Sequence, residues 1–245
     1  MGFANLKKEK LSNKRNNIKD REEIFQNIGV YNMQKIDMEN WPRKQHFDFF
    51  NKFDYPHFDI SVEIDIKHLI KYIKVKDISF FKTMVFLVTK NVNKIEEFKY
   101  RIINNEQVVI LDKVNPSFTI MGDNNVFSFC NSKYHENMKE FFESMDRNIN
   151  KYKEDPIVSS SENDLNAVYL TSIPWLSFKS ITHPIDIKNV DSNPRISWGK
   201  YYQENDKVLL PFSIQVHHAL MDGYHVSKYI NSLKEMVSKP KKYLK

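Results

Sequence analysis

The residues best suited to chemistry gather in one segment, Gln215 to His225, which reads QVHHALMDGYH. An apolar run typical of a strand precedes it and a helical pattern follows, so we expect a strand-to-helix turn. Turns of this kind hold side chains firmly at the edge of a sheet. A neutral His there can accept a proton near neutral pH. Gly223 is expected to adopt a backbone conformation that other residues avoid.

Three kinds of site fit this segment. A metal site would use His217, His218, Asp222 and His225. Adjacent His side chains, however, point to opposite sides of a continuing strand and rarely share one ion. A structural cluster would satisfy buried imidazoles with hydrogen bonds. A catalytic site would use one His as a general base. The segment by itself leaves all three open.

Four other segments share a pattern with one protein family. They read WPRKQHF at 41–47, NPSFT at 115–119, IPWLSFKS at 173–180 and GKY at 199–201. Together with HHALMDGYH they resemble the chloramphenicol acetyltransferases, whose elements include WxR(K/R)xHF, PWxxFxSF and HHxxxDGxH. Ile181 replaces the last Phe of the second element. The resemblance covers about residues 31–238, whereas HHxxxDG alone is also found, in weaker form, in dihydrolipoyl acyltransferases.

This resemblance implies an O-acetyltransferase that uses acetyl-CoA as co-substrate and no metal. His218, the second His of the pair, would be the general base, and the acceptor oxygen would attack the thioester directly in a ternary complex. Ser180 would hydrogen-bond the oxyanion of the tetrahedral intermediate, a contribution of about 3 kcal/mol in comparable enzymes. Asp222 would pair with Arg43 and so support the turn that presents His218, because a buried carboxylate needs such a partner.

The resemblance also implies chloramphenicol as the acceptor, and a homotrimer with active sites between its subunits. Three residues are candidates for substrate binding. Ser197 stands where the family has a Thr that helps to hold a water, and Phe50 where some members have a Tyr that contacts the drug. Met121 falls at another pocket position. The alternatives are a CoA-dependent O-acetyltransferase acting on a different alcohol, a non-catalytic trimeric binding protein on the same fold, and a zinc protein.

Composition narrows the class of protein. Apolar residues make up 41% and aromatic residues 13% of the 245 positions, enough for a sizeable core. The net charge of +6 rests on dispersed Lys with only six Arg, whereas nucleic-acid binders cluster basic residues and use Arg for base contacts, so no nucleic acid is expected. A single cysteine, Cys130, excludes an intramolecular disulfide and suits a reducing cytoplasm. No apolar window reaches about 18 residues, so no membrane span is expected.

Apolar periodicity predicts strands and helices that mix without strict alternation. The expected fold is α/β, a two-layer sandwich with a mixed β-sheet flanked by helices, and the resemblance implies the CoA-dependent acyltransferase fold. Residues 1–27 are expected to be a poorly ordered extension and 28–245 a single acetyltransferase domain. Strands are expected at 58–66, 100–103, 107–111, 118–121, 126–129, 167–171 and 207–216, and helices at 67–75, 79–92, 135–152 and 226–237.

Three local features are also predicted. Asn40 is expected to cap a short helix that buries Phe47, Phe50 and Phe53, which lie three apart. Asn104 and Asn105 are good turn residues between two short strands and predict a hairpin. The tail at 240–242 is expected to be solvated.

Overall fold

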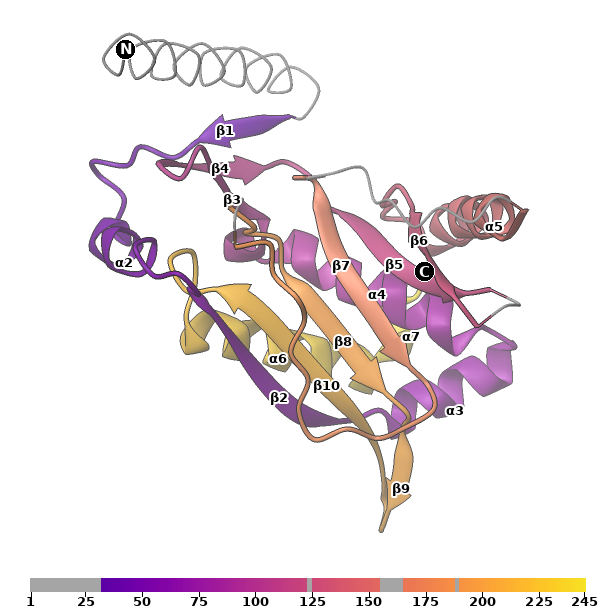
Figure 1. Ribbon diagram of the computed structural model, residues 1–245. Helices are drawn as coiled ribbons and strands as arrows, with labels where there is room; N and C mark the ends of the chain where they lie inside the picture. The colour runs from indigo at the N-terminus through magenta and orange to yellow at the C-terminus, as the bar shows by residue number, and fades with distance from the viewer. Residues whose placement is uncertain (1–31, 123–124, 155–164, 188–189) are drawn as a thin grey trace, which may run out of the picture.

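The main sheet is mixed and forms the centre of the molecule (Figure 1). The computed structural model describes residues 32–122, 125–154, 165–187 and 190–245, so the extension predicted at 1–27 and the polar segment 155–164 lie outside the described residues. The pairs β5–β7 and β7–β8 are parallel and the others antiparallel, which confirms the predicted mixed sheet. The strands run in the order β2 (His57–Asp65), β10 (Lys207–His217), β8 (Arg195–Gly199), β7 (Ala167–Ile173), β5 (Asn115–Met121) and β6 (Phe127–Asn131), with β9 (Tyr202–Glu204) paired to β10.

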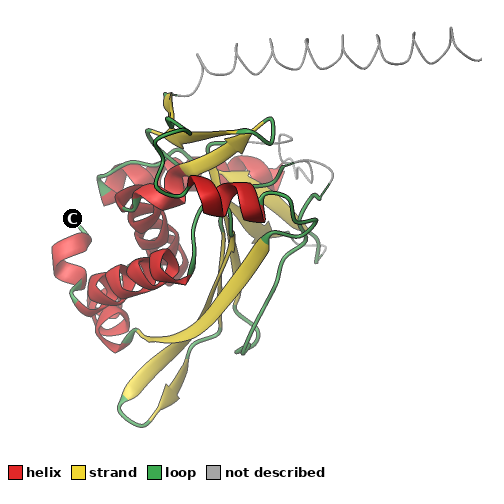
Figure 2. Cartoon of the chain, turned by 90° about the vertical axis from the view of Figure 1, so that its left-hand side faces the viewer, coloured by secondary structure: helices red, strands yellow, loops and turns green. Residues whose placement is uncertain are grey.

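Helices cover one face of this sheet. Figure 2 shows them gathered on one side of the strands, with loops on the other side. Their apolar residues pack on the sheet, as where Tyr229 stacks on Phe212 with ring centroids 6.5 Å apart. This arrangement confirms the predicted two-layer α/β architecture. The helices are α2 (Lys44–Phe50), α3 (Lys67–Lys76), α4 (Phe80–Lys94), α5 (Met138–Glu154), α6 (Gly223–Ser238) and α7 (Pro240–Tyr243), with a 3₁₀ turn η1 (Glu96–Lys99).

The two faces of the sheet differ in chemistry, because alternate side chains of a strand point to opposite sides. In β10, Phe212, Ile214 and Val216 are buried in the core with the helices. The intervening residues lie on the other face, here called the site face, and the loop 174–187 after β7 crosses it (Figure 1). Strand register on the site face aligns Ser61 with Ser213 and Ser197, Asp59 with Gln215, Arg195 and Tyr169, and His57 with His217.

A second, three-stranded antiparallel sheet lies beside the end of α2. It consists of β1 (Met33–Lys35), β4 (Gln107–Leu111) and β3 (Tyr100–Ile103). Asn104 and Asn105 join β3 to β4 with φ angles of 52° and 60°, the left-handed region that a tight hairpin turn requires. The predicted hairpin is therefore confirmed. Asn51 donates from its side chain to the Asn105 carbonyl at 2.7 Å, which ties this turn to the residue after α2.

The predicted start of helix α2 is wrong. The helix begins directly after Arg43, and the side chain of Asn40 donates instead to a nearby carboxylate. Of the three Phe residues expected on its buried face, only Phe47 is buried, while Phe53 lies beyond the end of the helix and is 48% exposed. The helix ends at Phe50, so the third Phe of the pattern, Phe53, has no helical face on which to be buried.

The C-terminal tail also differs from expectation. Lys241 and Lys242 are exposed as predicted, but residues 240–243 form the short helix α7, in which Pro240 is buried, as is Leu244 after it. These two residues lie four positions apart and so fall on one side of a helical turn.

Two other expectations concern the core and the membrane. Cys130 is buried in β6, and burial raises the pKa of its thiol to about 12. None of the helices within the described ranges has the length and hydropathy to cross a bilayer.

Candidate active site

The turn that follows β10 presents His218 between two aromatic rings. The imidazole stacks on Phe50 with ring centroids 3.8 Å apart and planes 8° apart, and Phe58 lies 4.6 Å away on a tilted plane. The His218 N–H donates to the Pro56 carbonyl at 2.7 Å, so the residue just before strand β2 holds its backbone as well. Its buried Nδ1 has no hydrogen-bond partner among the described residues. The ring is thus fixed in place by packing rather than by a polar side chain.

Arg43 reaches across from the start of α2 and closes this turn. Its Nη1 donates to Asp222 at 2.7 Å, its Nη2 to the His218 carbonyl at 2.8 Å and its Nε to the Ala219 carbonyl at 3.2 Å. Arg43 keeps only 11% of its side chain exposed. Two donors of one planar guanidinium therefore hold the carbonyls of His218 and Ala219, and the third holds the Asp222 side chain.

Asp222 is the N-cap of helix α6. Burial opposes its ionisation, but the Arg43 hydrogen bond, the His225 ring and the Tyr224 N–H together lower its pKa to about 2. Its carboxylate accepts from the Tyr224 N–H at 2.9 Å, while His225 Nδ1 accepts from the Asp222 N–H at 3.2 Å. His225 and Asp222 thus form a reciprocal cap, which stabilises the first turn of a helix. The ring nitrogen of His225 is used in this cap rather than offered to an ion.

Gly223 does not have the backbone conformation expected of it. No glycine in the described part of the chain has a positive φ, and a Cβ added at Gly223 would meet no atom within 4 Å. The residue is simply the first of helix α6. Its conformation is open to any residue, so backbone strain is not the reason for a glycine here.

His217 lies on the site face, and its ring is held by the residues around it. Its Nδ1 accepts from the Ala219 N–H at 3.2 Å, and its ring meets the ring of His57 edge-on with centroids 4.9 Å apart. Burial, followed by the neighbouring His57 and His218, lowers the pKa of His217 to about 3. The imidazole is therefore neutral and already bonded. Of the two adjacent His residues, His218 has no side-chain hydrogen bond among the described residues and is held by ring stacking instead.

Ser180 lies in the loop 174–187 and is exposed to solvent. The next residue, Ile181, accepts from the Ser213 hydroxyl at 3.3 Å, so Ser180 sits beside the middle of β10. His218 follows the end of that strand, five residues beyond Ser213. A strand rises about 3.3 Å per residue, so His218 lies about 16 Å from Ser213, and from the level of Ser180, along the strand direction. One chain therefore does not bring Ser180 and His218 together.

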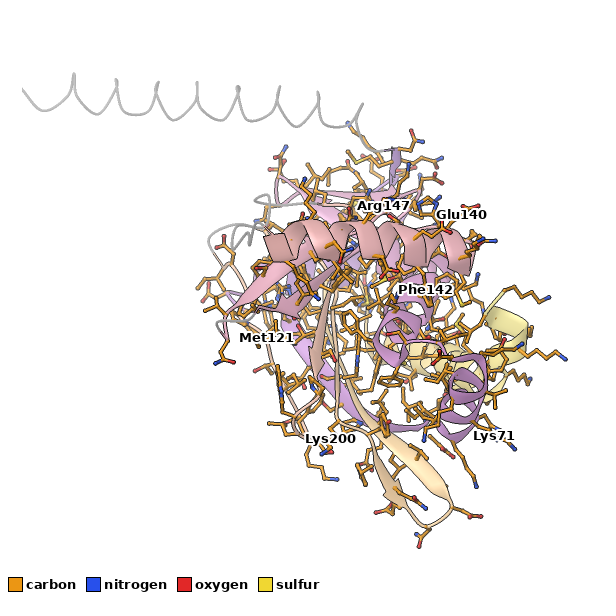
Figure 3. All side chains as sticks on the ribbon, turned by 90° about the vertical axis from the view of Figure 1, so that its right-hand side faces the viewer. Lys71, Met121, Glu140, Phe142, Arg147 and Lys200 are labelled. Atoms are coloured by element: carbon orange, nitrogen blue, oxygen red, sulfur yellow. The ribbon has the colours of Figure 1, made fainter. Side chains whose placement is uncertain are left out.

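The three candidate substrate-binding residues lie in different surroundings. Phe50 stacks on His218 and serves as its packing surface. Ser197 is 1% exposed, and its hydroxyl lies 2.6 Å from Nε2 of His183. Met121 is 44% exposed and borders a cavity of about 980 Å³ between β5, β7 and the loop 174–187. Figure 3 labels Met121 and Lys200, which both border a neighbouring cavity of about 360 Å³.

Sequence reasoning missed His183, Gln215 and Tyr55. Gln215 Nε2 donates to the Tyr55 hydroxyl at 2.7 Å, and Gln215 Oε1 accepts from the His183 N–H at 2.7 Å. Gln215 stands two residues before His217, so strand alternation already placed it on the same face. Nothing in the sequence pattern pointed to His183, because its partners are 14 and 32 positions away.

Comparison with known proteins agrees on one family. A family model described as chloramphenicol acetyltransferase matches residues 31–234. A chloramphenicol acetyltransferase of Proteus mirabilis is 34% identical over 203 residues, covering 82% of this chain and 92% of that protein. Chloramphenicol acetyltransferase 3 of Escherichia coli is 32% identical over 212 residues, covering 84% and 97%.

Solved structures share the fold. One chloramphenicol acetyltransferase structure superposes with a TM-score of 0.78 at 28% identity, covering 84% of this chain and 99% of that one. The dihydrolipoamide acetyltransferase of Azotobacter vinelandii superposes with a TM-score of 0.61 at 11% identity, covering 82% and 88%. The second likeness shows only that the chains have a common fold, the CoA-dependent acyltransferase fold.

Proposed function

The chain belongs to the chloramphenicol acetyltransferase family and is an acyltransferase, and from this premise we propose that it moves the acetyl group of acetyl-CoA to a hydroxyl of chloramphenicol. The observation that carries the proposal is the turn after β10, where Arg43 fixes the backbone of His218 while Phe50 and Phe58 fix its ring. A base whose ring and backbone are both held in one orientation is suited to take a proton from a bound hydroxyl.

The proposed reaction is a direct transfer in a ternary complex. His218 takes the proton of the acceptor hydroxyl as the oxygen attacks the thioester carbonyl carbon. Negative charge then develops on the carbonyl oxygen, where the Ser180 hydroxyl donates a hydrogen bond. The tetrahedral intermediate expels the CoA thiolate, which receives the proton from His218. No acyl-enzyme forms, and Asp222 and Arg43 take no part beyond holding the turn.

The separation of Ser180 from His218 supports an active site shared between copies of the chain. With about 16 Å between them in one chain, both can act on one substrate only if they come from neighbouring subunits. The same loop carries exposed apolar residues, with Trp175 64%, Leu176 51% and Ile187 68% exposed. Several large apolar side chains exposed on one loop are typical of a protein–protein contact. We therefore propose the homotrimer that the family resemblance implies.

The cavity beside the loop 174–187 is the proposed acceptor site. Met121, Ile173 and Trp175 line it with apolar surface, as an aromatic acceptor requires. The Ser197 hydroxyl already forms a hydrogen bond with His183, which leaves it less able to hold a water. In this chain the residue is thus better suited to shaping the loop than to binding the acceptor directly.

A different alcohol is the second candidate acceptor, favoured by one observation. The cavity wall includes Asp191 and Arg195, which form an ion pair with 14% and 11% of their side chains exposed. A charged pair at the wall suits an acceptor that is more polar than chloramphenicol. For localisation we propose the cytoplasm, since the one thiol, Cys130, is buried and unpaired.

One assay separates these candidates: thiol release from acetyl-CoA, measured with chloramphenicol, with a panel of other alcohols, and with no acceptor. We expect release that depends on chloramphenicol and is lost in His218→Ala. Release with another alcohol only would move the assignment to the second candidate. A folded protein that binds these compounds without thiol release would be a non-catalytic binding protein.

A further inference from the structure

The loop 174–187, which carries Ser180, depends on attachments elsewhere for its position. Ser180 is exposed, and no hydrogen bond among the described residues involves its side chain. Ahead of it, the Lys200 N–H donates to the Leu176 carbonyl at 2.9 Å. Beyond it, the attachment with the most contacts is at His183. The placement of the Ser180 hydroxyl therefore follows from how its neighbours are held.

The backbone of His183 pairs with a buried amide. Its N–H donates to Gln215 Oε1 at 2.7 Å, and Gln215 Nε2 donates to the His183 carbonyl at 3.4 Å. The other Nε2 hydrogen goes to the Tyr55 hydroxyl at 2.7 Å. Gln215 is 1% exposed, so water does not compete for these bonds. The side chain thus holds the loop backbone as a neighbouring strand would.

The imidazole of His183 is held by a second strand. Its Nε2 lies 2.6 Å from the hydroxyl of Ser197 on β8, which is 1% exposed. Burial, followed by the charge of Arg195, lowers the pKa of His183, so the ring is neutral near neutral pH. A neutral imidazole has both a donor and an acceptor nitrogen and can satisfy a buried hydroxyl. His183 is therefore attached to β10 through its backbone and to β8 through its ring, three residues after Ser180.

We propose that His183 is a positioning residue that acts through Ser180: its double attachment sets the loop so that the Ser180 hydroxyl meets the developing oxyanion. This inference rests on the proposed oxyanion role of Ser180. A misplacement of about 1 Å can cost about 10²-fold in rate. Two attachments nearer to Ser180 would remain without His183: the ion pair of exposed Lys179 with exposed Glu63 at 3.0 Å, and the bond from the Ser213 hydroxyl to the Ile181 carbonyl at 3.3 Å. An exposed ion pair contributes little and the second bond is long, so loss of the His183 attachments would leave Ser180 free to move by that much.

A double-mutant cycle tests the coupling. With saturating acetyl-CoA and chloramphenicol, we expect His183→Ala to lower kcat by about 10- to 100-fold and to leave the KM for acetyl-CoA within about twofold. In a Ser180→Ala background the same change lowers kcat by less than about twofold, because no hydroxyl remains to be placed. His183→Gln, whose amide can still reach Ser197, recovers part of the loss. His68→Ala, an exposed His on α3, serves as the matched control and keeps kcat at the parent value.

Amide hydrogen exchange gives a readout that needs no activity. In the loop peptide that spans Ser180, we expect faster exchange for His183→Ala and for Ser197→Ala than for the parent chain. For His68→Ala we expect exchange at the parent rate. Ser197→Ala removes the hydroxyl that bonds the His183 ring, so it tests the same attachment if His183→Ala does not fold. Unchanged loop exchange in both variants overturns the inference, whatever the acceptor is.

The outcomes also separate this inference from the proposed function. Equal losses from His183→Ala in the parent and Ser180→Ala backgrounds overturn the positioning role and leave the function intact. A Ser180→Ala variant with the parent kcat removes the oxyanion role of Ser180, and the inference with it. Faster loop exchange without any acetyl transfer from the parent chain would support the attachment and reject chloramphenicol as the acceptor.

Discussion

His218 differs from the other imidazoles near it in what holds it. His217 and His225 each accept a backbone N–H, at 3.2 Å in both cases, so one ring nitrogen of each is already bonded. His218 instead rests on Phe50 and keeps its Nδ1 unbonded. An aromatic surface fixes a ring without using its nitrogens, which is what a general base needs.

We predict that His218→Ala lowers turnover by about 10²- to 10⁴-fold, the usual contribution of a general base. The fold should remain, since the side chain donates no hydrogen bond to the protein. Thiol release measures the rate and circular dichroism measures the fold, with His68→Ala as the control. Turnover within a few-fold of the parent would mean that another group takes the proton.

We predict that Ser180→Ala lowers kcat by about 10²- to 10³-fold with little change in either KM. The hydroxyl is needed mainly in the transition state, and such interactions affect turnover rather than ground-state affinity. Steady-state kinetics distinguishes this from a binding role, which would raise KM at constant kcat. Ser238→Ala, at the far end of α6, is the control for loss of a serine hydroxyl.

The sequence could suggest which residues form the site but not most of the contacts between them. The pairing of Arg43 with Asp222 spans 179 positions, and only the match of two motifs connected them in advance. The link from His183 to Ser197 belongs to no such motif. It depends on the path of a loop without regular structure, and hydrophobic periodicity carries no information about such a path.

At the scale of elements, the turn from β10 into α6 gains stability from an ionised cap. The folded pKa of Asp222, about 2, is below its ordinary value of 3.8, so its contribution is present above pH 3.8 and is lost as the pH falls toward 2. Because the side chain is 34% exposed, solvent screening reduces this contribution to about 1–2 kcal/mol. That is less than the 3–5 kcal/mol typical of a fully buried pair.

We therefore predict that Asp222→Asn lowers the free energy of unfolding by about 1–2 kcal/mol at pH 7 and by less at pH 3. Urea unfolding at several pH values measures the difference. Asp206→Asn, at a fully exposed carboxylate, should change stability by less than about 0.5 kcal/mol. An equal effect of Asp222→Asn at both pH values would show that the charge is not responsible.

Gly199 lets the loop approach the sheet. A Cβ there would lie 2.9 Å from the Leu176 carbonyl oxygen and 3.1 Å from the ring of Phe178. We predict that Gly199→Ala costs about 1–3 kcal/mol by overpacking, and that it lowers activity by shifting the loop. Gly223→Ala is the matched control for stability, since open space surrounds that position and Ala favours a helix. Equal melting temperatures for the two variants would contradict the close approach.

The strands and helices in which apolar residues recur with a clear period were the part of the fold that could be predicted. Strand β2, predicted at 58–66, runs from His57 to Asp65, and helix α3, predicted at 67–75, runs from Lys67 to Lys76. Strand β8 was missed, because it is short and buried on both sides of its backbone, so its residues show no clean alternation. The short strands β1 and β9 depend on partners distant in the chain or on a turn, and have no strong pattern of their own.

At the scale of the whole molecule, a shared active site makes a quantitative prediction. Three copies of the 29.3-kDa chain have a mass of about 88 kDa, which light scattering measures directly. Ser180→Ala and His218→Ala chains are each expected to be nearly inactive alone. When they are unfolded, mixed in equal amounts and refolded together, about a quarter of the sites receive an intact Ser180 from one chain and an intact His218 from its neighbour.

Thiol release from the refolded mixture should therefore reach about a quarter of the parent rate. The control is each variant refolded alone, which gives only its own residual rate. A mixture no more active than the variants alone would place both residues in one chain. That outcome would conflict with the separation of about 16 Å along β10.

The two-faced sheet has a consequence for laboratory evolution. Along β10, odd-numbered positions such as 213, 215 and 217 face the site, whereas even-numbered positions 212, 214 and 216 face the core. The odd positions are as buried as the even ones, and Gln215 and His217 hold the loop 174–187 and the turn at His218. A mutant library at even positions would consist mostly of clones lost to misfolding, whereas a library at odd positions would displace the loop and the turn. Screening both libraries for soluble protein and for activity would therefore separate the positions that keep the chain folded from those that place the site.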